Sequence, residues 1–425
     1  MLKKLVFAAS LFLFFSVQIA FAARQVGPID TSGEIEGAPF RIVVPANWNG
    51  TLLVYGHGYR DKADHPGEVD NRNADIAPSA ALVPVLLAQG YALAGSAYKD
   101  NGWAVEEGVQ DLKNLTVYFR DNVTKPDRTI LWAFSMGTVI GFKSMEQFGG
   151  IYDGALCGCA VGAGATQSWD GAGDLALAYD TVFGMPAAWG SFGDVRDDID
   201  FETEVQPKLI GEVSNPLNFP KFEFIRLVSG TPGRGITPPA GFYPGWLFTD
   251  MFFSMEARSE LERRAGGAIV QNLDRNYTLT DAERAYLQNV LMVPSAVIDS
   301  WLMQMNGQRF IDPPNDARNY VKHNADYSGK IKHPVLTMHT VVDPLVTVSQ
   351  EYEYAETVNN AGRGNLLYQT YTNGNGHCNF TGTQLITAVT AINNWVKDGT
   401  KPTAATFPAA AGFVPGFVPP PMNQP

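Results

Sequence analysis

Short, almost entirely apolar runs alternate with helix-length segments over most of this chain. The run 51–55 precedes a predicted helix over 79–89, and further apolar runs follow at 91–94 and 129–134. A strand that is apolar throughout must be covered on both faces, as in a parallel sheet. Strands that alternate with helices of this length build βαβ units. The pattern therefore predicts an α/β fold with a mostly parallel central sheet and helices on both faces.

The alternation stops in the middle of the chain and then resumes. Residues 165–332 are rich in aromatic residues and Pro–Gly stretches, with helical periodicity at 251–265 and 281–291. We interpret this segment as a mostly helical lid inserted between the sixth and seventh strands, although part of it could instead add strands to the sheet. The core would then comprise residues 23–164 and 333–400. A Pro/Ala-rich tail, 401–425, completes the chain as a loose extension or a surface-wrapping arm.

The first 22 residues have the features of a secretory signal peptide. Lys3 and Lys4 precede an apolar run, and Ala20 and Ala22 supply the small residues of a cleavage site. The run is shorter than the ~20 residues that span a bilayer. We therefore expect cleavage near Ala22, a secreted or periplasmic protein, and no membrane span in the mature chain.

Charge and cysteine content exclude several classes of protein. The 425 residues include 31 Lys and Arg against 43 Asp and Glu, which gives a net charge of −12. Such an acidic chain is a poor general binder of nucleic acid or anionic membranes. Three Cys and six His do not form a zinc module, and no nucleotide-binding or zinc-protease motif is present. We expect neither a metal nor an organic cofactor.

A serine stands at the turn between a buried strand and a helix. Ala133-Phe134-Ser135-Met136-Gly137 begins in the strand and runs directly into the next predicted helix. A nucleophile in such a sharp turn needs small residues two positions before and two after it. Ala133 and Gly137 meet that need, so Ser135 is the candidate nucleophile; an ordinary capping serine is the alternative.

An acid and a base follow in the order that such a nucleophile requires. Asp343 ends one late strand, and His377 lies in the loop after the next. The carboxyl ends of parallel strands meet at one edge of a sheet, where active sites lie. We therefore predict a catalytic triad of Ser135, Asp343 and His377. Four other residues do not meet this condition, because each precedes or lies within a strand: His323, Asp326, His333 and His339.

Two backbone N–H groups are needed to stabilise an oxyanion. Met136 follows the nucleophile at a helix N-terminus, where the helix dipole favours an anion. Tyr59 follows His57-Gly58 after an early strand, and the glycine permits close backbone approach. We predict Tyr59 and Met136 as the donors, with His57 and Gly58 as the supporting loop; a plain tight turn is the alternative at His57.

Together these motifs resemble the α/β-hydrolase fold. The resemblance spans about residues 40–397 and implies hydrolysis through an acyl-enzyme, without naming a substrate. Gly376-His377-Cys378 and the aromatic insertion are also similar to secreted tannase and feruloyl-esterase-like enzymes. Those enzymes place a cysteine directly before the nucleophile, whereas Phe134 stands here.

The function predicted is a secreted serine carboxylic ester hydrolase acting on a small-molecule or polymer ester. A prolyl-type peptidase or aminopeptidase on the same fold is the alternative. In that case acidic residues of the lid would bind the free amine of the substrate: Asp197, Asp198, Glu202 and Glu204. A non-catalytic binding protein is the third reading. Several lid aromatics between Trp169 and Phe253 are expected to line an apolar pocket above Ser135, or else to form the core of the lid itself.

The cysteines predict one disulfide. Cys159 lies near the carboxyl end of the strand that follows the serine turn, and Cys378 lies beside His377 at the same edge of the sheet. In an exported protein a pair so placed is expected to oxidise. We predict Cys159–Cys378, with Cys157 as a buried thiol; three unpaired thiols are the alternative.

Overall fold

The computed structural model describes residues 26–238, 245–311 and 315–422. The predicted signal peptide lies outside these ranges. None of the helices in these ranges is both long enough and apolar enough to cross a membrane.

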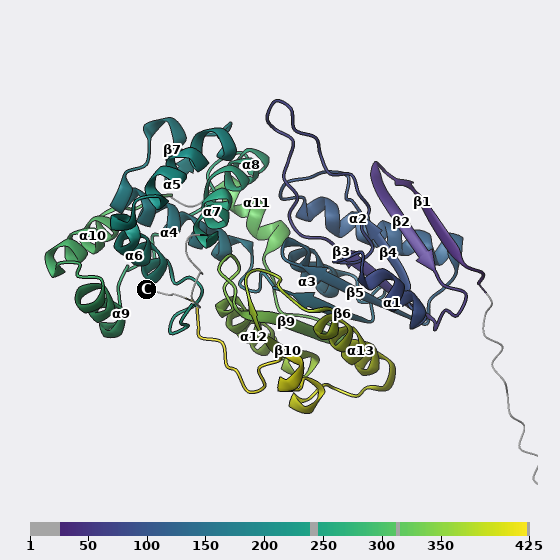
Figure 1. Ribbon diagram of the computed structural model, residues 1–425. Helices are drawn as coiled ribbons and strands as arrows, with labels where there is room; N and C mark the ends of the chain where they lie inside the picture. The colour runs from purple at the N-terminus through teal and green to yellow at the C-terminus, as the bar shows by residue number, and fades with distance from the viewer. Residues whose placement is uncertain (1–25, 239–244, 312–314, 423–425) are drawn as a thin grey trace, which may run out of the picture.

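One eight-stranded sheet organises the chain, in the order β1-β2-β4-β3-β5-β6-β9-β10 (Figure 1). The β1–β2 and β2–β4 pairs are antiparallel and the remaining pairs are parallel. This is the strand order of the α/β-hydrolase fold, so the predicted fold class is confirmed. The strands are β1 Ile29–Ile35, β2 Ala38–Val44, β3 Thr51–Gly56, β4 Ala92–Ser96, β5 Arg128–Phe134, β6 Gly154–Gly158, β9 Val335–Val342 and β10 Leu367–Asn375.

Helices cover both faces of the sheet because its central strands are apolar on both sides. In β3, Leu52 and Val54 pack into one hydrophobic cluster, while Leu53 and Tyr55 pack into the other. The first cluster is covered by α2, α3 and α12, and the second by α1 and α13. These helices are α1 Leu82–Ala88, α2 Val105–Tyr118, α3 Met136–Gln147, α12 Ser349–Asn360 and α13 Gly382–Asp398, with a π-helical turn η1 Phe119–Val123 after α2.

The segment between β6 and β9 forms a helical layer beside the carboxyl edge of the sheet (Figure 1). We call it the insertion, residues 165–332. Among its described residues no strand joins the main sheet; a short hairpin, β7 Gly190–Ser191 with β8 Asp194–Val195, pairs only with itself. Its helices are α4 Ala165–Phe183, α5 Gln206–Val213, α6 Phe219–Ser229, α7 Gly245–Phe252, α8 Arg258–Ala265, α9 Asp281–Ala285, α10 Ser295–Gly307 and α11 Asp316–Ala325, with π-helical turns η3 Phe201–Val205, η5 Phe253–Ala257 and η6 Tyr286–Val290, and 3-10 turns η2 Ala187–Trp189 and η4 Pro216–Asn218.

The tail follows the core surface as an arm. Phe407 and Phe413 are buried against the face that carries α13, and Phe413 forms an isolated bridge with Thr372 of β10. The arm then continues toward the insertion, as Figure 1 shows in yellow. Short 3-10 turns punctuate this part of the chain, namely η7 Gly364–Leu366, η8 Ala404–Thr406 and η9 Ala409–Ala411.

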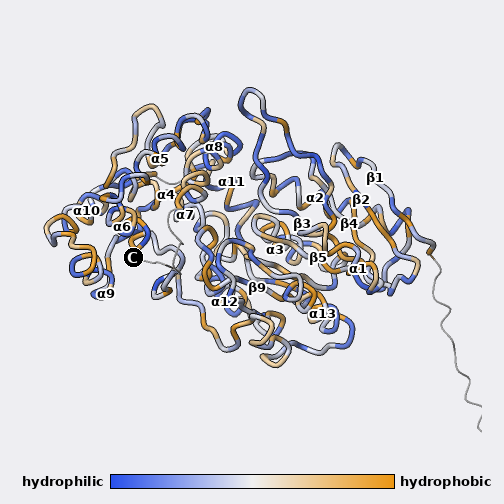
Figure 2. Tube along the Cα trace, viewed as in Figure 1, coloured by the Kyte–Doolittle hydropathy of each residue, from blue (hydrophilic) through white to orange (hydrophobic). Residues whose placement is uncertain are grey.

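Hydropathy follows this architecture. Figure 2 shows hydrophobic stretches along the central strands and their covering helices, whereas the loop 59–75, which rises beside the insertion, is hydrophilic.

Candidate active site

Ser135 occupies a strained turn at the carboxyl edge of the sheet. It separates β5 from α3 and has φ 54° and ψ −130°, a conformation rarely adopted by a residue with a side chain. The turn closes because Gly137 lacks a Cβ: a Cβ there would lie 2.4 Å from the Gly56 carbonyl oxygen and 2.6 Å from that of His57. The small residues read from the sequence therefore bring Ser135 against the loop after β3.

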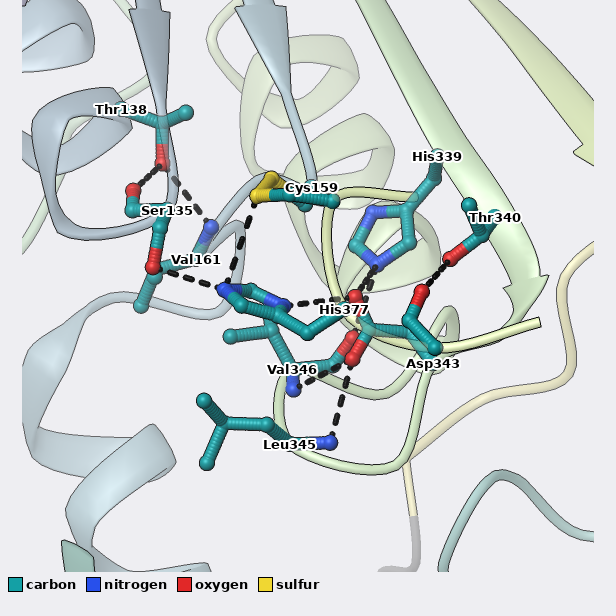
Figure 3. Close-up of a disulfide and its surroundings, with 12 residues drawn as sticks. Ser135, Thr138, Cys159, Val161, His339, Thr340, Asp343, Leu345, Val346 and His377 are labelled. Atoms are coloured by element: carbon teal, nitrogen blue, oxygen red, sulfur yellow. Dashed lines mark hydrogen bonds and ion pairs between the residues drawn. A yellow bond between two sulfur atoms is a disulfide. The ribbon is translucent and has the colours of Figure 1, made fainter. Parts of the chain in front are cut away.

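Three side chains from different parts of the chain form one hydrogen-bonded series (Figure 3). Ser135 Oγ lies 2.8 Å from His377 Nε2, and His377 Nδ1 lies 2.8 Å from Asp343 Oδ2. Asp343 follows β9 directly, and His377 follows β10. The structure thus brings together the three residues predicted from their positions after strands.

Asp343 is buried and is held by several donors. Its Oδ1 accepts hydrogen bonds from the backbone N–H groups of Leu345 and Val346, at 3.1 and 3.0 Å. Burial alone would raise the pKa of Asp343, but His377 and His339 beside it hold that pKa below its usual range. The carboxylate is therefore ionised and fixed in orientation toward His377 Nδ1.

His339 supports Asp343 from inside the sheet. Its Nε2 donates to the Val346 carbonyl oxygen at 2.7 Å and lies 3.5 Å from Asp343 Oδ2, while its Nδ1 lies 3.1 Å from Glu351 Oε1. Burial opposes a charge on His339, but the Asp343 and Glu351 carboxylates raise its pKa to about 10. Both ring nitrogens therefore carry protons, and His339 is a buried cation.

Glu351 was missed by the sequence analysis. It accepts a hydrogen bond from Thr337 at 2.5 Å and another from Gln369 at 2.5 Å. Its helical spacing from two apolar residues could have indicated that it is buried. Glu351, Tyr354 and Val358 share one face of α12, and all three are buried. A glutamate on an apolar helix face requires a buried partner, and His339 is that partner.

The loop predicted to supply an oxyanion donor lies against Ser135. A Cβ on Gly58 would lie 3.0 Å from Ser135 Cβ. His57 stacks on Tyr98, and its Nδ1 donates to the Gly58 carbonyl oxygen at 2.7 Å. Burial and the nearby Arg60 lower the pKa of His57 to about 3, so the ring is neutral. Because the Gly58 carbonyl and the Tyr59 N–H belong to one peptide unit, His57 orients that N–H.

A pocket that is partly open to solvent lies beside Ser135, which forms part of its lining. Tyr59 and Met136, the two predicted donors, both line it. Its remaining walls come from the core, from the insertion, from the loop after Asp343 with the start of α12, and from the arm: Trp103, Val161, Ser168, Trp169, Gly171, Ala172, Leu175, Ser229, Thr231, Asp250, Phe253, Ser254, Pro344, Leu345, Val346, Thr347, Gln350 and Met422.

The aromatic residues of the insertion divide between the pocket and the core of the insertion. Trp169 and Phe253 line the pocket, and they are the first and last of the described aromatic residues in the range 169–253. Most of the others are buried within the insertion or pack against its core: Trp189, Phe192, Phe222, Phe224, Trp246, Phe248 and Phe252. The expectation that several line the pocket therefore holds for two residues, because the helices need the rest for their own packing. Tyr243 lies outside the described residues.

The predicted disulfide is present. Cys159 and Cys378 are bonded across a sequence separation of 219 residues, with their Cα atoms 5.1 Å apart, and Cys157 is a buried free thiol. A sulfur atom of the disulfide lies 3.6 Å from His377 Nε2 (Figure 3). The bond therefore anchors the loop that carries His377 to the strand beside the serine turn.

The other acids and histidines considered from sequence lie elsewhere. Asp326, at the end of α11, accepts hydrogen bonds from Thr166 of α4. His333 contacts the Gly149 carbonyl oxygen. The four acids that could read an amine do not line the pocket, and two of them, Asp198 and Glu204, pair with Arg196.

Comparisons with known proteins find similarity at low sequence identity. No protein-family model matches it. It is 22% identical over 427 residues to an o-phthalyl amidase from Xanthobacter agilis, which covers 86% of this chain and 87% of the amidase. Similar solved structures include an esterase from Pyrococcus furiosus, with 13% identity, a TM-score of 0.40 and coverage of 88% of this chain and 91% of that one. Feruloyl esterase B from Aspergillus oryzae gives 13% identity, a TM-score of 0.42 and coverage of 88% and 80%.

Proposed function

We propose that this protein is a serine hydrolase that cleaves carboxylic esters through an acyl-enzyme. The observation that carries the proposal is the hydrogen-bonded series from Ser135 through His377 to Asp343, at the base of a pocket. Ser135 Oγ attacks the carbonyl carbon while His377 Nε2 takes its proton, and the Asp343 carboxylate stabilises the imidazolium. His377 then protonates the leaving alcohol, and water releases the acid by the same steps.

The negative charge that develops on the carbonyl oxygen needs two donors. The N–H of Met136 at the start of α3 and the N–H of Tyr59 are the proposed pair. The geometry supports Tyr59 because His57 holds the carbonyl of the same peptide unit. A donor fixed in advance costs no reorganisation during the reaction, and this is the role that we assign to His57.

The pocket favours an uncharged acyl group of aryl size. Trp103, Trp169 and Phe253 give it aromatic walls, and among its described lining residues there is no Lys, Arg or His to pair with a substrate anion. Asp250 is buried, with an unpartnered Oδ1. Burial and the nearby Asp343 carboxylate keep the pKa of Asp250 well above its usual range, so its neutral carboxyl can donate a hydrogen bond to the substrate.

Amide hydrolysis is the second candidate, because the curated relative described above is an amidase. A triad of this kind can cleave either bond, and the two differ in the leaving group that His377 must protonate. An aminopeptidase is less well supported, since the acids expected to read a free amine do not line the pocket.

A panel of aryl-acyl nitrophenyl esters, the matching nitroanilides and amino-acid nitroanilides tests the proposal. We expect the esters to be cleaved fastest, with activity abolished by a serine-directed phosphonate. Preference for the plain nitroanilides would assign an amidase, and preference for the amino-acid nitroanilides would assign a peptidase. Hydrolysis that resists the phosphonate would contradict the serine mechanism.

We also propose that the protein is exported. The support is the sequence of residues 1–22, with its positive start, apolar run and small-residue cleavage site. Amino-terminal sequencing of the mature protein tests this, and we expect the chain to begin at Ala23.

A further inference from the structure

Gln350 presents an amide nitrogen to the pocket that Ser135 lines. It is the second residue of α12, and it lines the pocket although it is only 5% exposed. Its Oε1 accepts a hydrogen bond from the Ala163 N–H at 3.4 Å and lies 2.9 Å from the Ser168 hydroxyl oxygen. A backbone N–H can only donate, so the amide oxygen must face Ala163 and the nitrogen Nε2 must point away from it.

The Nε2 nitrogen of Gln350 forms no hydrogen bond within the described part of the chain, and the protein does not seal it off from the pocket. Its two N–H groups are therefore held in place and unpaired. A fixed polar group of this kind discriminates strongly between a ligand that offers a partner and one that does not. Gln350 thus favours a substrate with a hydrogen-bond acceptor at this position.

This acceptor is distinct from the carbonyl that Ser135 attacks. In the sheet, β3 and β9 lie on opposite sides of β5, the strand that leads to Ser135. The proposed oxyanion donor Tyr59 follows β3, whereas Gln350 follows β9. The oxyanion donors and Gln350 therefore approach the substrate from opposite sides of the nucleophile. What Gln350 binds is a second group of the substrate.

Asp250 supplies a second polar group, from the insertion. It lies in α7, lines the pocket and is 6% exposed. Its Oδ1 is buried with no hydrogen-bond partner among the described residues. Burial and the Asp343 carboxylate keep the pKa of Asp250 well above its usual range. The carboxyl therefore carries a proton, and its O–H, like the Gln350 amide, is a donor without an acceptor.

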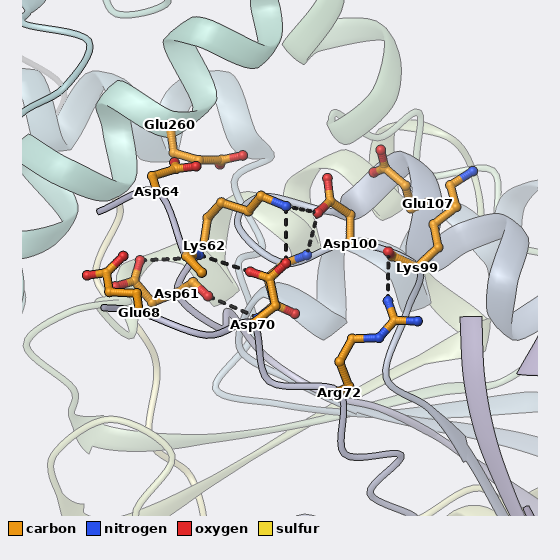
Figure 4. Close-up of polar contacts among 12 residues, drawn as sticks. Asp61, Lys62, Asp64, Glu68, Asp70, Arg72, Lys99, Asp100, Glu107 and Glu260 are labelled. Atoms are coloured by element: carbon orange, nitrogen blue, oxygen red, sulfur yellow. Dashed lines mark hydrogen bonds and ion pairs between the residues drawn. The ribbon is translucent and has the colours of Figure 1, made fainter. Parts of the chain in front are cut away.

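A charged carboxylate on the substrate would not suit this part of the pocket. The described lining residues include no Lys, Arg or His. Lys62, on the loop beside the insertion, is engaged by Asp70 and Asp100 (Figure 4). The ionised Asp343 lies near enough to Asp250 to affect its protonation, and it would repel a second anion. An uncharged acceptor is therefore favoured, and a carbonyl oxygen, with its two lone pairs, can accept from two donors.

We propose that Gln350 and Asp250 determine specificity by holding a second, uncharged carbonyl group on the acyl part of the substrate. The inference rests on the proposed hydrolase function and names its acyl class, an aryl group that carries a ketone, ester or amide substituent. The Trp103 and Trp169 rings pack against the aryl group, while the two polar side chains bind the substituent. Both residues act on the choice of substrate and not on the reacting carbonyl.

Matched pairs of esters test the role of Gln350. The pairs are nitrophenyl esters of 3- and 4-acetylbenzoic acid and of 3- and 4-isopropylbenzoic acid, because the two substituents have the same shape and only acetyl has a carbonyl. Acetyl also activates the ester electronically, so the acetyl-to-isopropyl ratio of kcat/KM is compared between proteins. At one ring position, Gln350→Leu should lower this ratio at least about tenfold. Gln304→Leu, at an exposed position of α10 outside the pocket, is the matched control and should change it less than about twofold.

Two variants test Asp250 in the same assay. Asp250→Leu removes the donor and should lower the ratio as Gln350→Leu does. Asp250→Asn keeps an uncharged donor and should retain the ratio of wild type. If Asp250 only supported the fold, Asp250→Leu would slow both esters of a pair equally and leave their ratio unchanged, which would remove Asp250 from the proposal.

Calorimetric binding to Ser135→Ala makes the same comparison without turnover. We expect this variant to bind an acetyl ester more tightly than its isopropyl partner. If wild type cleaves the isopropyl esters but neither the ratio nor the Kd responds to the carbonyl at either ring position, the inference is wrong while the proposed function stands. If wild type cleaves no ester, the proposed function fails, and the Kd values alone decide: equal values for both members of each pair would overturn the inference.

Discussion

His339 lies behind Asp343 with its Nε2 3.5 Å from Oδ2, the same carboxylate oxygen that pairs with His377. A buried cation on one side of Asp343 and the imidazole of His377 on the other give this carboxylate two reasons to stay ionised. The ionised state of Asp343, the proposed acid of the triad, is therefore stabilised by His339, which does not line the substrate pocket.

This arrangement predicts a pH-dependent stability. The pKa of His339 is raised from 6.5 to about 10 in the folded protein. Its contribution is fully present below about pH 6.5 and is lost as the pH rises through about 10. We expect the Tm of wild type to fall between pH 7 and pH 10 more steeply than that of His339→Gln. Parallel Tm profiles of the two proteins would show that His339 is neutral.

Gly137→Ala should damage activity more than it damages folding. The new Cβ would meet the backbone oxygens of Gly56 and His57, which cannot move without shifting the loop that carries Tyr59. Displacing one oxyanion donor costs about 10²-fold in kcat in comparable enzymes. Steady-state kinetics should show a fall in kcat of about that size. Gly211→Ala, in α5 and outside the pocket, where a Cβ would meet nothing within 4 Å, is the control and should leave kcat close to wild type.

Reduction of the disulfide should lower activity before it unfolds the protein. Chain entropy alone gives the bond about 5 kcal/mol at most for a loop of this length. Cys378 is adjacent to His377, so the His377 loop should loosen first. Activity and tryptophan fluorescence followed together in increasing reductant should show activity lost first. Cys157→Ala should behave like wild type, and coincident loss of both signals would contradict local loosening.

The tail should influence substrate binding through Met422. This residue lines the pocket, and its N–H donates to Glu353 at 3.2 Å. The variant Met422→Ala removes an apolar contact with the substrate and leaves Ser135 in place. KM should therefore rise severalfold, with kcat little changed. Val418→Ala, at an exposed position of the same arm, is the control. An unchanged KM for Met422→Ala would remove the tail from the site.

Positions after strands were predictable because the geometry of a parallel sheet is regular. Ser135, Asp343 and His377 each follow a strand, and such ends meet at one edge. The Cys159–Cys378 pair was predictable for the same reason. Each inference needed only strand boundaries, which buried apolar runs mark clearly.

Other features depended on packing that local patterns do not encode. The strand β1 was not predicted, because its sequence IDTSGEI is largely polar and forms an edge hairpin with β2. The His339–Glu351 pair required knowing which face of α12 meets the sheet. The course of the tail depended on Phe407 and Phe413, two anchors within an otherwise Pro/Ala-rich segment.

Covalent labelling tests the central claim most directly. The intact mass of the protein should be measured after treatment with a fluorophosphonate, followed by peptide mapping of the adduct. We predict one adduct, located on Ser135, with loss of esterase activity in proportion to labelling. Ser135→Ala should take no label and should lose roughly three or more orders of magnitude in turnover while keeping its Tm. An adduct on another residue, or near-normal ester hydrolysis by Ser135→Ala, would contradict the account.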